Sequence, residues 1–361
     1  MDQELDDLVA VVTPLLRLLA ALEFAGRYLH LPDSGAVLAA LGSPDTPLRA
    51  ARSRLDRWPD RLEGVKAPLV TAAEASLAGW DRLSAAAGPG GDPVSAWRAL
   101  RQLPRAQEAL WPLAPLLPPI SRYFLDAPAR ASHELQARLM DPSPGAGVDH
   151  VDNAYGTHGG YSVYFPETGD PPQPAPLVMA LHGGTGHGRG FLWSWLPAAR
   201  AAGALLVAPT SLDATWNLHA PEEDSANLLR ILAETRARWP IDPSRLLLTG
   251  MSDGGTFAYI SGLQPDSPFT HLAPVAAAFH PFMLALADAP RLKDLPIHIV
   301  HGRLDWMFPV ELAQQARSSL AAAGCAVEYS EIEDLSHAYP REINRRLLEW
   351  LGVNVPESGP A

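Results

Sequence analysis

The spacing of apolar residues changes partway along this chain. Over residues 1–125 these residues recur at helical intervals and show no strand-like alternation. The first helical stripe comprises Leu5, Leu8, Val12, Leu15 and Leu19. Further helices are predicted at residues 34–57, 67–87, 92–102 and 104–117, separated by Pro and Gly. The pattern predicts an all-helical N-terminal domain at residues 1–140, followed by a Pro- and Gly-rich linker at residues 141–147.

From Val148 onward, short apolar runs of strand length alternate with helical patterns. The predicted strands lie at residues 153–155, 161–165, 176–181, 204–208, 246–248, 275–279, 295–300 and 326–332. Helices are predicted at residues 225–239 and 341–351, the first preceded by acidic residues that the helix dipole favours. This alternation predicts an α/β fold, a mostly parallel sheet flanked by helices on both faces. The second domain spans residues 148–353 and leaves a tail at 354–361.

The run from Leu246 to Gly255 carries the strongest chemical signal. Its apolar residues lead into Gly250-Met251-Ser252-Asp253-Gly254, and a helix-compatible segment follows. Between a strand and a helix, Gly-x-Ser-x-Gly forms a sharp turn that exposes its serine, and the glycines let neighbouring elements pass closely. The motif alone is weak evidence because it arises by chance in Gly-rich chains. Ser252 becomes a strong candidate nucleophile only if an oxyanion loop, a histidine and an acid accompany it.

An oxyanion loop is predicted after the strand at residues 176–181, where His182-Gly183-Gly184 follows. A strand that ends in His-Gly-Gly resembles the oxyanion loop of α/β-hydrolases. In those enzymes a backbone N–H of this loop acts together with the N–H of the residue after the nucleophile. The resemblance therefore implies that the N–H groups of Gly184 and Asp253 form the oxyanion hole in this chain.

The acid and the base are predicted after the last two strands. In the α/β-hydrolase architecture the acid lies on the turn after the penultimate strand, which nominates Asp305. His337 lies on the loop after the last strand. The order Ser252, Asp305, His337 is that of α/β-hydrolases and differs from the orders of chymotrypsin-like and subtilisin-like proteases. Asp334 competes with Asp305, but an acid three positions before the histidine rarely faces the imidazole correctly.

Other histidines compete with His337 as the base. His298 lies in the middle of a predicted strand and is expected to be a core residue. His301 lies at the end of the same strand and is expected to shape the turn that holds Asp305. His280 follows the apolar run that ends at Phe279, at a predicted strand end where ligands gather in such sheets. A structural role and a cleft-lining role are both open for His280.

Together these motifs resemble the phospholipase/carboxylesterase branch of the α/β-hydrolases, near the polyhydroxybutyrate-depolymerase and feruloyl-esterase-like members. The resemblance covers about residues 148–352 and includes Asp242-Pro243-Ser244-Arg245 before the nucleophile strand. It implies ester hydrolysis by a Ser-His-Asp triad through an acyl-enzyme, with no metal or organic cofactor. Trp216 resembles an aromatic residue that lines the cleft in such esterases. With Trp306 and His280, it completes the candidate substrate-binding residues.

Two other functions stay open at this point. A peptidase or amidase of the prolyl-oligopeptidase-like type shares the triad order, although such enzymes usually carry a large β-propeller before the catalytic domain. The third function is that of a non-catalytic binding protein on a hydrolase fold. The helical N-terminal domain likewise has three open roles: a lid over the cleft, an oligomerisation element or a partner-binding module.

Charge and cysteine content bear on which molecules the protein binds and in which compartment it is expected. The 361 residues include 28 Lys and Arg against 40 Asp and Glu, and most of the net charge of −12 lies beyond residue 125. Such an acidic body is a poor partner for nucleic acid or anionic membranes. The single cysteine, Cys325, allows no intrachain disulfide, and the acidic N-terminus differs from the basic start of a secretory signal.

The longest apolar stretch, Leu8–Leu22, contains Pro14 and Arg17 and is shorter than the ~20 apolar residues of a membrane span. We therefore expect a cytoplasmic protein that acts on a small-molecule ester. No nucleic acid and no integral membrane association are expected, and a homo-oligomer formed through the N-terminal helices is one option for its assembly.

Overall fold

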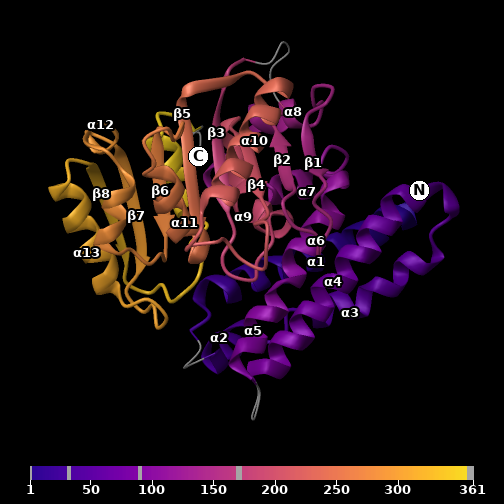
Figure 1. The fold of residues 1–361 in the computed structure, drawn as a ribbon. Helices are drawn as coiled ribbons and strands as arrows, with labels where there is room; N and C mark the ends of the chain where they lie inside the picture. The colour runs from indigo at the N-terminus through magenta and orange to yellow at the C-terminus, as the bar shows by residue number, and fades with distance from the viewer. Residues whose placement is uncertain (1, 31–33, 88–91, 168–172, 356–361) are drawn as a thin grey trace. The chain divides into compact units, whose positions relative to one another are not determined.

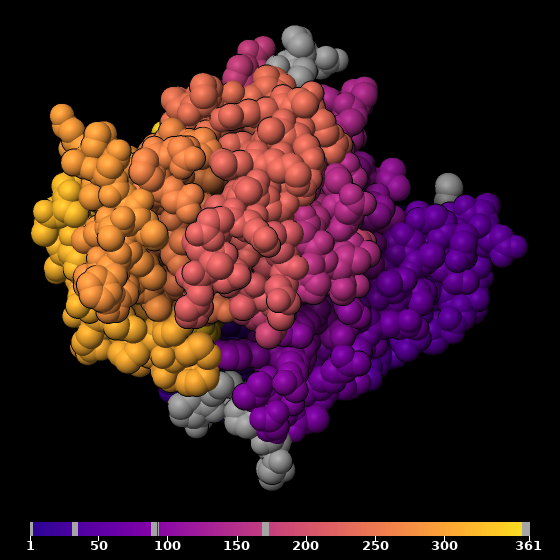
Figure 2. All heavy atoms as spheres, viewed as in Figure 1, coloured from indigo at the N-terminus to yellow at the C-terminus, as the bar shows by residue number. Residues whose placement is uncertain are grey.

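The chain forms two compact units. The computed structural model describes residues 2–30, 34–87, 92–167 and 173–355. The units comprise Met1–Phe124 and Leu125–Ala361 (Figure 1). Figure 2 draws them with all heavy atoms, indigo to violet for the first unit and magenta to yellow for the second. The unit boundary lies before the predicted linker, so residues 125–140 belong with the second unit.

The described part of the first unit is helical and contains no strand, in agreement with the apolar pattern. Here η denotes a 3₁₀ helix. The elements are α1 Asp2–Tyr28, α2 Ser34–Leu41, α3 Thr46–Ala51, η2 Arg52–Arg57, η3 Asp60–Leu62, α4 Glu63–Ala87, α5 Pro93–Leu100, α6 Gln102–Leu110, η4 Trp111–Leu113 and α7 Pro118–Tyr123. The helix expected at 34–57 is thus three pieces. Gly42 adopts a left-handed backbone (φ 65°) directly after α2, a conformation that ends helices.

Helix α1 is longer than its pattern suggested. Pro14 lies inside the helix without ending it, and Arg17 does not interrupt it. By length and composition, Gln3–Tyr28 is apolar enough to cross a membrane, contrary to the expectation that no stretch reaches that length. Within the most apolar 18 residues of this helix, 50% is buried inside the protein. The core helix of a water-soluble protein meets the same two criteria.

The second unit is built around one sheet. Its elements are η5 Pro128–Ala131, α8 His133–Leu139, β1 Gly147–Val151, β2 Tyr161–Phe165, β3 Ala175–Leu181, α9 Gly188–Ala202, β4 Leu205–Pro209, α10 Glu222–Arg238, β5 Ile241–Met251, α11 Asp253–Gly262, β6 His271–Val275, η6 Pro281–Leu286, α12 Ala289–Leu292, β7 Pro296–Gly302, α13 Val310–Ala322, β8 Ala326–Ile332 and α14 Ile343–Trp350. The eight strands have the order β1-β2-β4-β3-β5-β6-β7-β8. Strands β1, β2 and β4 pair antiparallel, and all other neighbours are parallel. This confirms the expected mostly parallel sheet.

Two strand predictions were wrong for a shared backbone reason. Residues 153–155 are not a strand: β1 precedes them and ends where Asp152 takes a positive φ of 48°. The run 275–279 contributes only its first residue, because Ala276 has a φ of 46° and leaves β6. A left-handed residue turns the chain out of the ladder. Ala seldom adopts that conformation, and Asp, although enriched in it, adopts it too rarely for its presence to predict it.

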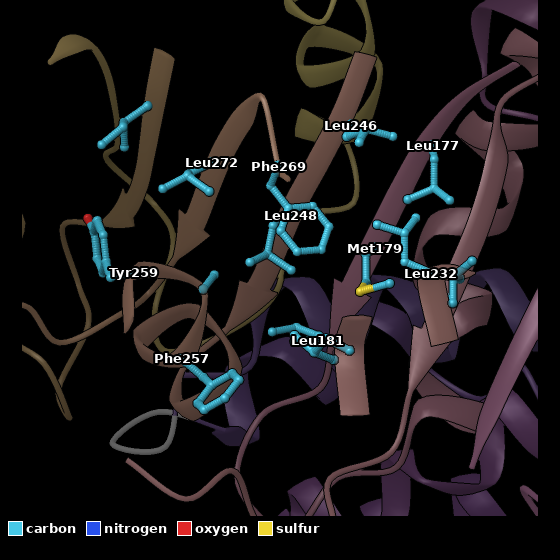
Figure 3. Close-up of a cluster of buried hydrophobic side chains, with 14 of the residues drawn as sticks. Leu177, Met179, Leu181, Leu232, Leu246, Leu248, Phe257, Tyr259, Phe269 and Leu272 are labelled. Atoms are coloured by element: carbon cyan, nitrogen blue, oxygen red, sulfur yellow. The ribbon is translucent and has the colours of Figure 1, made fainter. Parts of the chain in front are cut away.

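Alternate residues of the central strands pack on opposite faces of the sheet. Leu177, Met179 and Leu181 of β3 belong to a buried cluster that also contains side chains of α10, α11 and α13 (Figure 3). On the opposite face α9 and α14 contact each other, and Trp350 of α14 meets the ring of His298 at 5.4 Å. Both faces of β3 are therefore covered, which explains its unbroken apolar run.

An ion pair is buried between β2 and α9. Arg200 Nε and a second guanidinium nitrogen donate to Glu167 at 2.5 and 2.9 Å, and the Tyr164 hydroxyl donates to the same carboxylate at 3.1 Å. The Arg200 and Glu167 side chains are 0% and 2% exposed. Burial, and then the negative charge of Glu167, raise the pKa of Tyr164 well above its usual value, so its hydroxyl stays a donor. The group fixes the helix that follows the candidate oxyanion loop.

We expect Arg200→Met to lower the free energy of unfolding by about 3–5 kcal/mol, because Glu167 would stay buried without its cation. Arg303→Met is the matched control: it removes an ion pair with Glu333 whose side chains are 56% and 72% exposed, and should cost less than about 1 kcal/mol. Urea unfolding followed by circular dichroism measures both. Equal losses in the two variants would contradict a structural role for the buried pair.

Candidate active site

All candidate chemical groups lie on loops after parallel strands. Ser252 follows β5, the His182-Gly183-Gly184 loop begins at the end of β3, Asp305 follows β7, and His337 follows β8. Carboxyl ends of parallel strands share one edge of a sheet, where ligands bind in such folds. The topology therefore brings together residues that are far apart in the sequence.

Ser252 occupies a strained turn between β5 and α11. Its φ of 55° and ψ of −119° lie outside the regions that non-glycine residues favour. A Cβ on Gly250 would stand 2.5 Å from the Gly254 carbonyl carbon, and one on Gly254 would stand 2.3 Å from the His182 oxygen. Both approaches require glycine, as the motif predicts. The strain holds the Ser252 side chain at the edge of the sheet.

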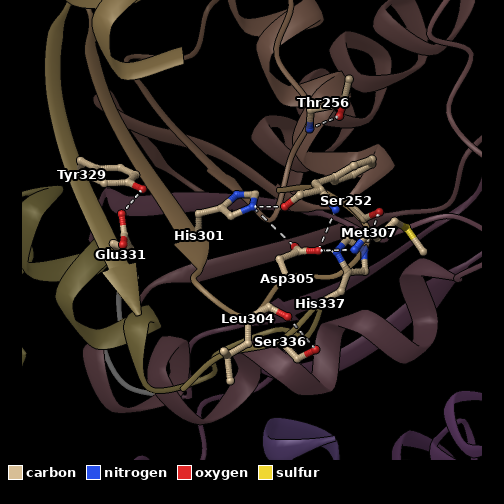
Figure 4. A network of polar contacts seen from close by, with 12 residues as sticks. Ser252, Thr256, His301, Leu304, Asp305, Met307, Tyr329, Glu331, Ser336 and His337 are labelled. Atoms are coloured by element: carbon tan, nitrogen blue, oxygen red, sulfur yellow. Dashed lines mark hydrogen bonds and ion pairs between the residues drawn. The ribbon is translucent and has the colours of Figure 1, made fainter. Parts of the chain in front are cut away.

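His337 connects Ser252 to Asp305 (Figure 4). Its Nε2 accepts from the Ser252 hydroxyl at 3.1 Å, and its Nδ1–H donates to Asp305 Oδ2 at 2.8 Å. The residues Ser252, His337 and Asp305 are 7%, 4% and 6% exposed. Asp334, the competing acid, is exposed on the loop before His337. The arrangement suits proton transfer from the serine to the ring.

The Asp305 carboxylate is held from two sides. Oδ1 accepts the backbone N–H groups of Met307 and Phe308 at 2.9 and 2.8 Å, while Oδ2 faces His337. Burial opposes the charge, but the bonds from His337 and Phe308 outweigh it, so the pKa of Asp305 is lowered. The carboxylate stays ionised and can stabilise a positive charge on the imidazole.

His301 shapes the Asp305 turn, as expected. Its ring is fully buried, and Nε2 donates to the Phe308 carbonyl at 2.8 Å while lying 3.6 Å from Asp305 Oδ2. His298, expected in the core, is also fully buried; its Nε2 bonds the Ser330 hydroxyl at 2.9 Å, and burial lowers its pKa. Both histidines thus have structural surroundings distinct from His337.

The loop after β3 is fixed by the side chain of His182. Nδ1–H donates to the Gly183 carbonyl at 2.8 Å, and Nε2 accepts the Ser211 N–H at 3.1 Å. The ring is buried, and desolvation lowers the pKa of His182 to about 4. Since Nε2 must be bare to accept, the ring is neutral in this arrangement. The next residue, Gly183, is thereby positioned beside Ser252, and Gly184 lies beside Asp253.

The loops that carry the two predicted oxyanion donors meet at Ser252 and Asp253. Asp253 is the first residue of α11, so its N–H has no acceptor within the helix. A Cβ on Gly183 would stand 3.5 Å from Ser252 Cβ, which places the β3 loop against the serine. A Cβ on Gly184 would stand 2.8 Å from Asp253 Oδ2, so these two residues are neighbours. The oxyanion-hole role of their N–H groups stays a prediction.

Comparison with known proteins finds a match over the part of the chain that contains the three candidate triad residues. A family model described as phospholipase/carboxylesterase matches residues 219–353, which include Ser252, Asp305 and His337. The matched residues make up less than half of the chain, and over them the chain resembles the phospholipase/carboxylesterase family. The β3 loop precedes the matched residues. A search of curated proteins found no match.

Several solved structures resemble part of the chain. A thermostable esterase is 22% identical, with a TM-score of 0.45 over 54% of this chain; the likeness spans 58% of that esterase, less than two thirds of its length. FphF, a fluorophosphonate-binding serine hydrolase of Staphylococcus aureus, is 14% identical, with a TM-score of 0.49 over 58% of this chain and 99% of its own. SOBER1 of Arabidopsis thaliana is 17% identical, with a TM-score of 0.40 over 49% of this chain and 98% of its own.

Trp216 supports the β3 loop and does not line a cleft, which corrects the sequence-based expectation. It is 1% exposed, its ring stacks on Phe257 at 5.2 Å, and its indole N–H donates to the His182 carbonyl at 2.8 Å. That carbonyl is the atom that crowds Gly254. An apolar ring that also satisfies a buried carbonyl explains the tryptophan here.

The other two predicted substrate-binding residues are accessible. Trp306 is 43% exposed and directly follows Asp305. His280 is exposed beyond the end of β6, where Nδ1 accepts the Phe282 N–H at the start of η6. Trp306 lies next to the candidate triad because it is the neighbour of Asp305 in the sequence. It gives His280 a helix-capping role.

Sequence reasoning missed the side chains that hold the β4–α10 loop. Asp224 is buried and accepts the N–H groups of Leu212 and Asn217 at 3.0 and 2.9 Å, so it does more than complement the α10 dipole. In the same loop, Thr215 donates its hydroxyl to Asp253 Oδ2 at 2.7 Å. An acid in the first helical turn is the signal that could have indicated Asp224.

The His337 loop has a similar support. The Tyr339 hydroxyl donates to Asn344 Oδ1 at 2.7 Å, and Asn344 Nδ2 donates to the Ser194 carbonyl of α9 at 2.9 Å. Tyr339 also meets Phe191 of α9 edge-on at 5.1 Å. Within the described residues, no three His, Cys, Asp or Glu side chains gather as ligands for a metal ion.

We expect the stability cost of His182→Asn to shrink by about 2 kcal/mol as the pH falls from 7 to 4.5. The pKa of His182 in the folded chain, about 4, is below the unfolded value of about 6.5. The unfolded chain therefore takes up the proton first, and the wild type loses stability through this window while the variant lacks that loss. Thermal unfolding at several pH values measures the difference. A cost independent of pH would contradict a neutral buried ring.

Proposed function

We propose that this chain is a serine carboxylesterase that hydrolyses carboxylic esters through an acyl-enzyme. One observation carries the proposal: the Ser252 hydroxyl, the His337 ring and the Asp305 carboxylate form a continuous hydrogen-bonded line, with bonds of 3.1 and 2.8 Å. Each member alone has an ordinary structural explanation. Their alignment, together with the two proposed backbone N–H donors, fits acyl transfer better than it fits any other reaction.

The proposed reaction follows from the residue types. His337 Nε2 takes the Ser252 proton as the serine oxygen attacks the ester carbonyl, since a neutral hydroxyl is a weak nucleophile. Asp305 holds the ring with Nδ1 protonated and stabilises the imidazolium. His337 then gives the proton to the leaving alkoxide. Water attacks the acyl-enzyme with the same base and releases the acid.

Negative charge on the carbonyl oxygen would be stabilised by the N–H groups of Gly184 and Asp253. Each well-placed donor contributes roughly 3–4 kcal/mol to lowering such a barrier. The donors are backbone groups, so their position depends on the loops that carry them. Trp216, His182 and Thr215 fix those loops through the bonds described above.

Apolar side chains beside the triad favour an ester with an apolar acyl or alcohol part. Leu304, Trp306 and Met307 are 45%, 43% and 40% exposed and flank Asp305 in the chain. Large exposed apolar side chains that gather at one site mark binding surfaces. Trp306 is the member with the largest ring and is the proposed substrate contact. The cytoplasmic location and the lack of a nucleic-acid partner stay predictions from composition.

We expect Ser252→Ala to lower kcat for p-nitrophenyl esters by at least about 10⁴-fold, because the nucleophile is lost while the fold is kept. Hydrolysis of acetate to laurate esters by both proteins measures this. Thermal unfolding of the variant checks the fold. Alanine keeps the Cβ and so the strain of the turn, and the free energy of unfolding should change by less than about 1 kcal/mol. Undiminished turnover in the variant would exclude Ser252 as the nucleophile.

The same preparation separates the alternatives. A folded wild type that cleaves peptide p-nitroanilides but not esters would replace the esterase proposal with a peptidase. A folded wild type inactive on both would favour a binding protein. Either result contradicts the function proposed here.

We expect Trp306→Ala to lower kcat/KM for p-nitrophenyl laurate about tenfold while changing the acetate value less than about twofold, because only a long acyl chain reaches the indole. Leu286→Ala, an apolar residue of η6 with 36% exposure, is the control. A uniform loss across chain lengths would place Trp306 in support of Asp305 instead of in the substrate site.

A further inference from the structure

One side of α1 exposes apolar side chains along its whole length. Leu5, Val9, Phe24 and Tyr28 are 59%, 57%, 43% and 37% exposed. The positions 5, 9, 16, 20, 24 and 28 are four or seven residues apart, which places them on one face of a helix. Thr13, Leu16 and Ala20 fill the face between its ends, and Thr13 and Ala20 are exposed. We call this set the α1 face.

The opposite side of α1 is the core of the first unit. Its fully buried members are Val11, Leu15, Leu18, Leu19 and Leu22. The exposed side contains Asp6 and Arg17 as well as the four large apolar side chains. Helix α1 is covered on one side only, although its exposed side contains two aromatic rings in contact, Phe24 and Tyr28 at 4.5 Å. The α1 face therefore has the composition of an interface.

The α1 face is symmetric about its midpoint between residues 16 and 17. Leu5 and Tyr28 lie equally far from that point, and so do Val9 and Phe24. Thr13 and Ala20, two small residues, form the third such pair. An identical helix laid antiparallel on this one would therefore place Leu5 opposite Tyr28, Val9 opposite Phe24 and Thr13 opposite Ala20.

Charges on the same face follow the same symmetry. Asp6 lies three residues before Val9 and is exposed, and Arg27 lies three residues after Phe24. These two residues are also equidistant from the midpoint, so each copy would set Asp6 opposite Arg27 of the other. Arg17 falls opposite Leu16, along which its aliphatic stem can lie. Antiparallel pairing also sets the helix dipoles in opposition.

We propose that a second copy of this chain covers the α1 face in an antiparallel, two-fold symmetric dimer. In such an interface residue i meets residue j and j meets i, which is the symmetry that the α1 face has. One helix pair is at the small end of specific interfaces, below about 1,200 Å² in total. We therefore expect a dimer with a dissociation constant in the micromolar range.

Sedimentation velocity of the full chain between about 1 and 200 µM tests the proposal. The wild type should pass from monomer to dimer, and the double variant Val9→Gln/Phe24→Gln should associate at least about 100-fold more weakly. Leu116→Gln, at a residue of the same unit that is 61% exposed and lies outside the α1 face, should dimerise as the wild type does. Circular dichroism verifies that each variant is folded.

A charge exchange tests the antiparallel register. Asp6→Arg and Arg27→Asp alone should each weaken the dimer about tenfold, because like charges would then face each other. The combined variant restores opposite charges and should return to within about threefold of the wild type. A double variant weaker than either single variant would overturn the register.

Two further outcomes would overturn the dimer itself. The first is a wild type that stays monomeric at 200 µM. Flotation with phosphatidylcholine vesicles, with and without phosphatidylglycerol, then shows whether a bilayer covers the α1 face instead. The second is a dimer that the Val9/Phe24 variant retains in full, which would place the interface elsewhere.

Discussion

The candidate site depends on one close approach, between the His182 carbonyl at the end of β3 and the backbone of Gly254 at the start of α11. Any side chain at Gly254 would collide with that oxygen at 2.3 Å. The approach sets the β3 loop directly against the strained Ser252 turn, so the proposed nucleophile and the proposed oxyanion donors lie on adjoining segments. The carbonyl is buried, and the Trp216 indole satisfies its hydrogen-bonding need. Without that bond, the crowding would leave a costly unpaired acceptor.

Successive layers of polar contacts keep this arrangement in place. His182 bridges the Gly183 carbonyl and the Ser211 N–H only as a neutral ring, and its lowered pKa is consistent with that state. Asp224 holds the loop that carries Thr215 and Trp216. These residues touch no reacting atom. They act by restricting the backbone, and backbone donors have no side-chain rotamer to correct a misplaced loop.

Residue spacing was sufficient to predict the strands after which the site residues lie. Central parallel strands are buried on both faces and appear as unbroken apolar runs, and the chemistry follows each run directly. Spacing was not sufficient for Trp216, because the sequence does not show whether an aromatic on a loop faces a cleft or the core beneath it. Ala276 shows the same limit for the backbone: its left-handed conformation accompanies a bond from its N–H to the Val300 carbonyl in β7, a tertiary contact that no local pattern encodes.

Helix α1 shows why periodicity alone misassigns a face. The stripe that begins at Leu5 predicts one buried side, and Val12, Leu15 and Leu19 are indeed buried, yet Leu5 is exposed. A helix rich in apolar residues on every side contains several overlapping stripes, and each has helical spacing. Only the contacts within the unit decide which stripe forms its core. The remaining stripe then stays in solvent, which is unfavourable in proportion to its area, and pairing with an identical face is the simplest way to remove it from water.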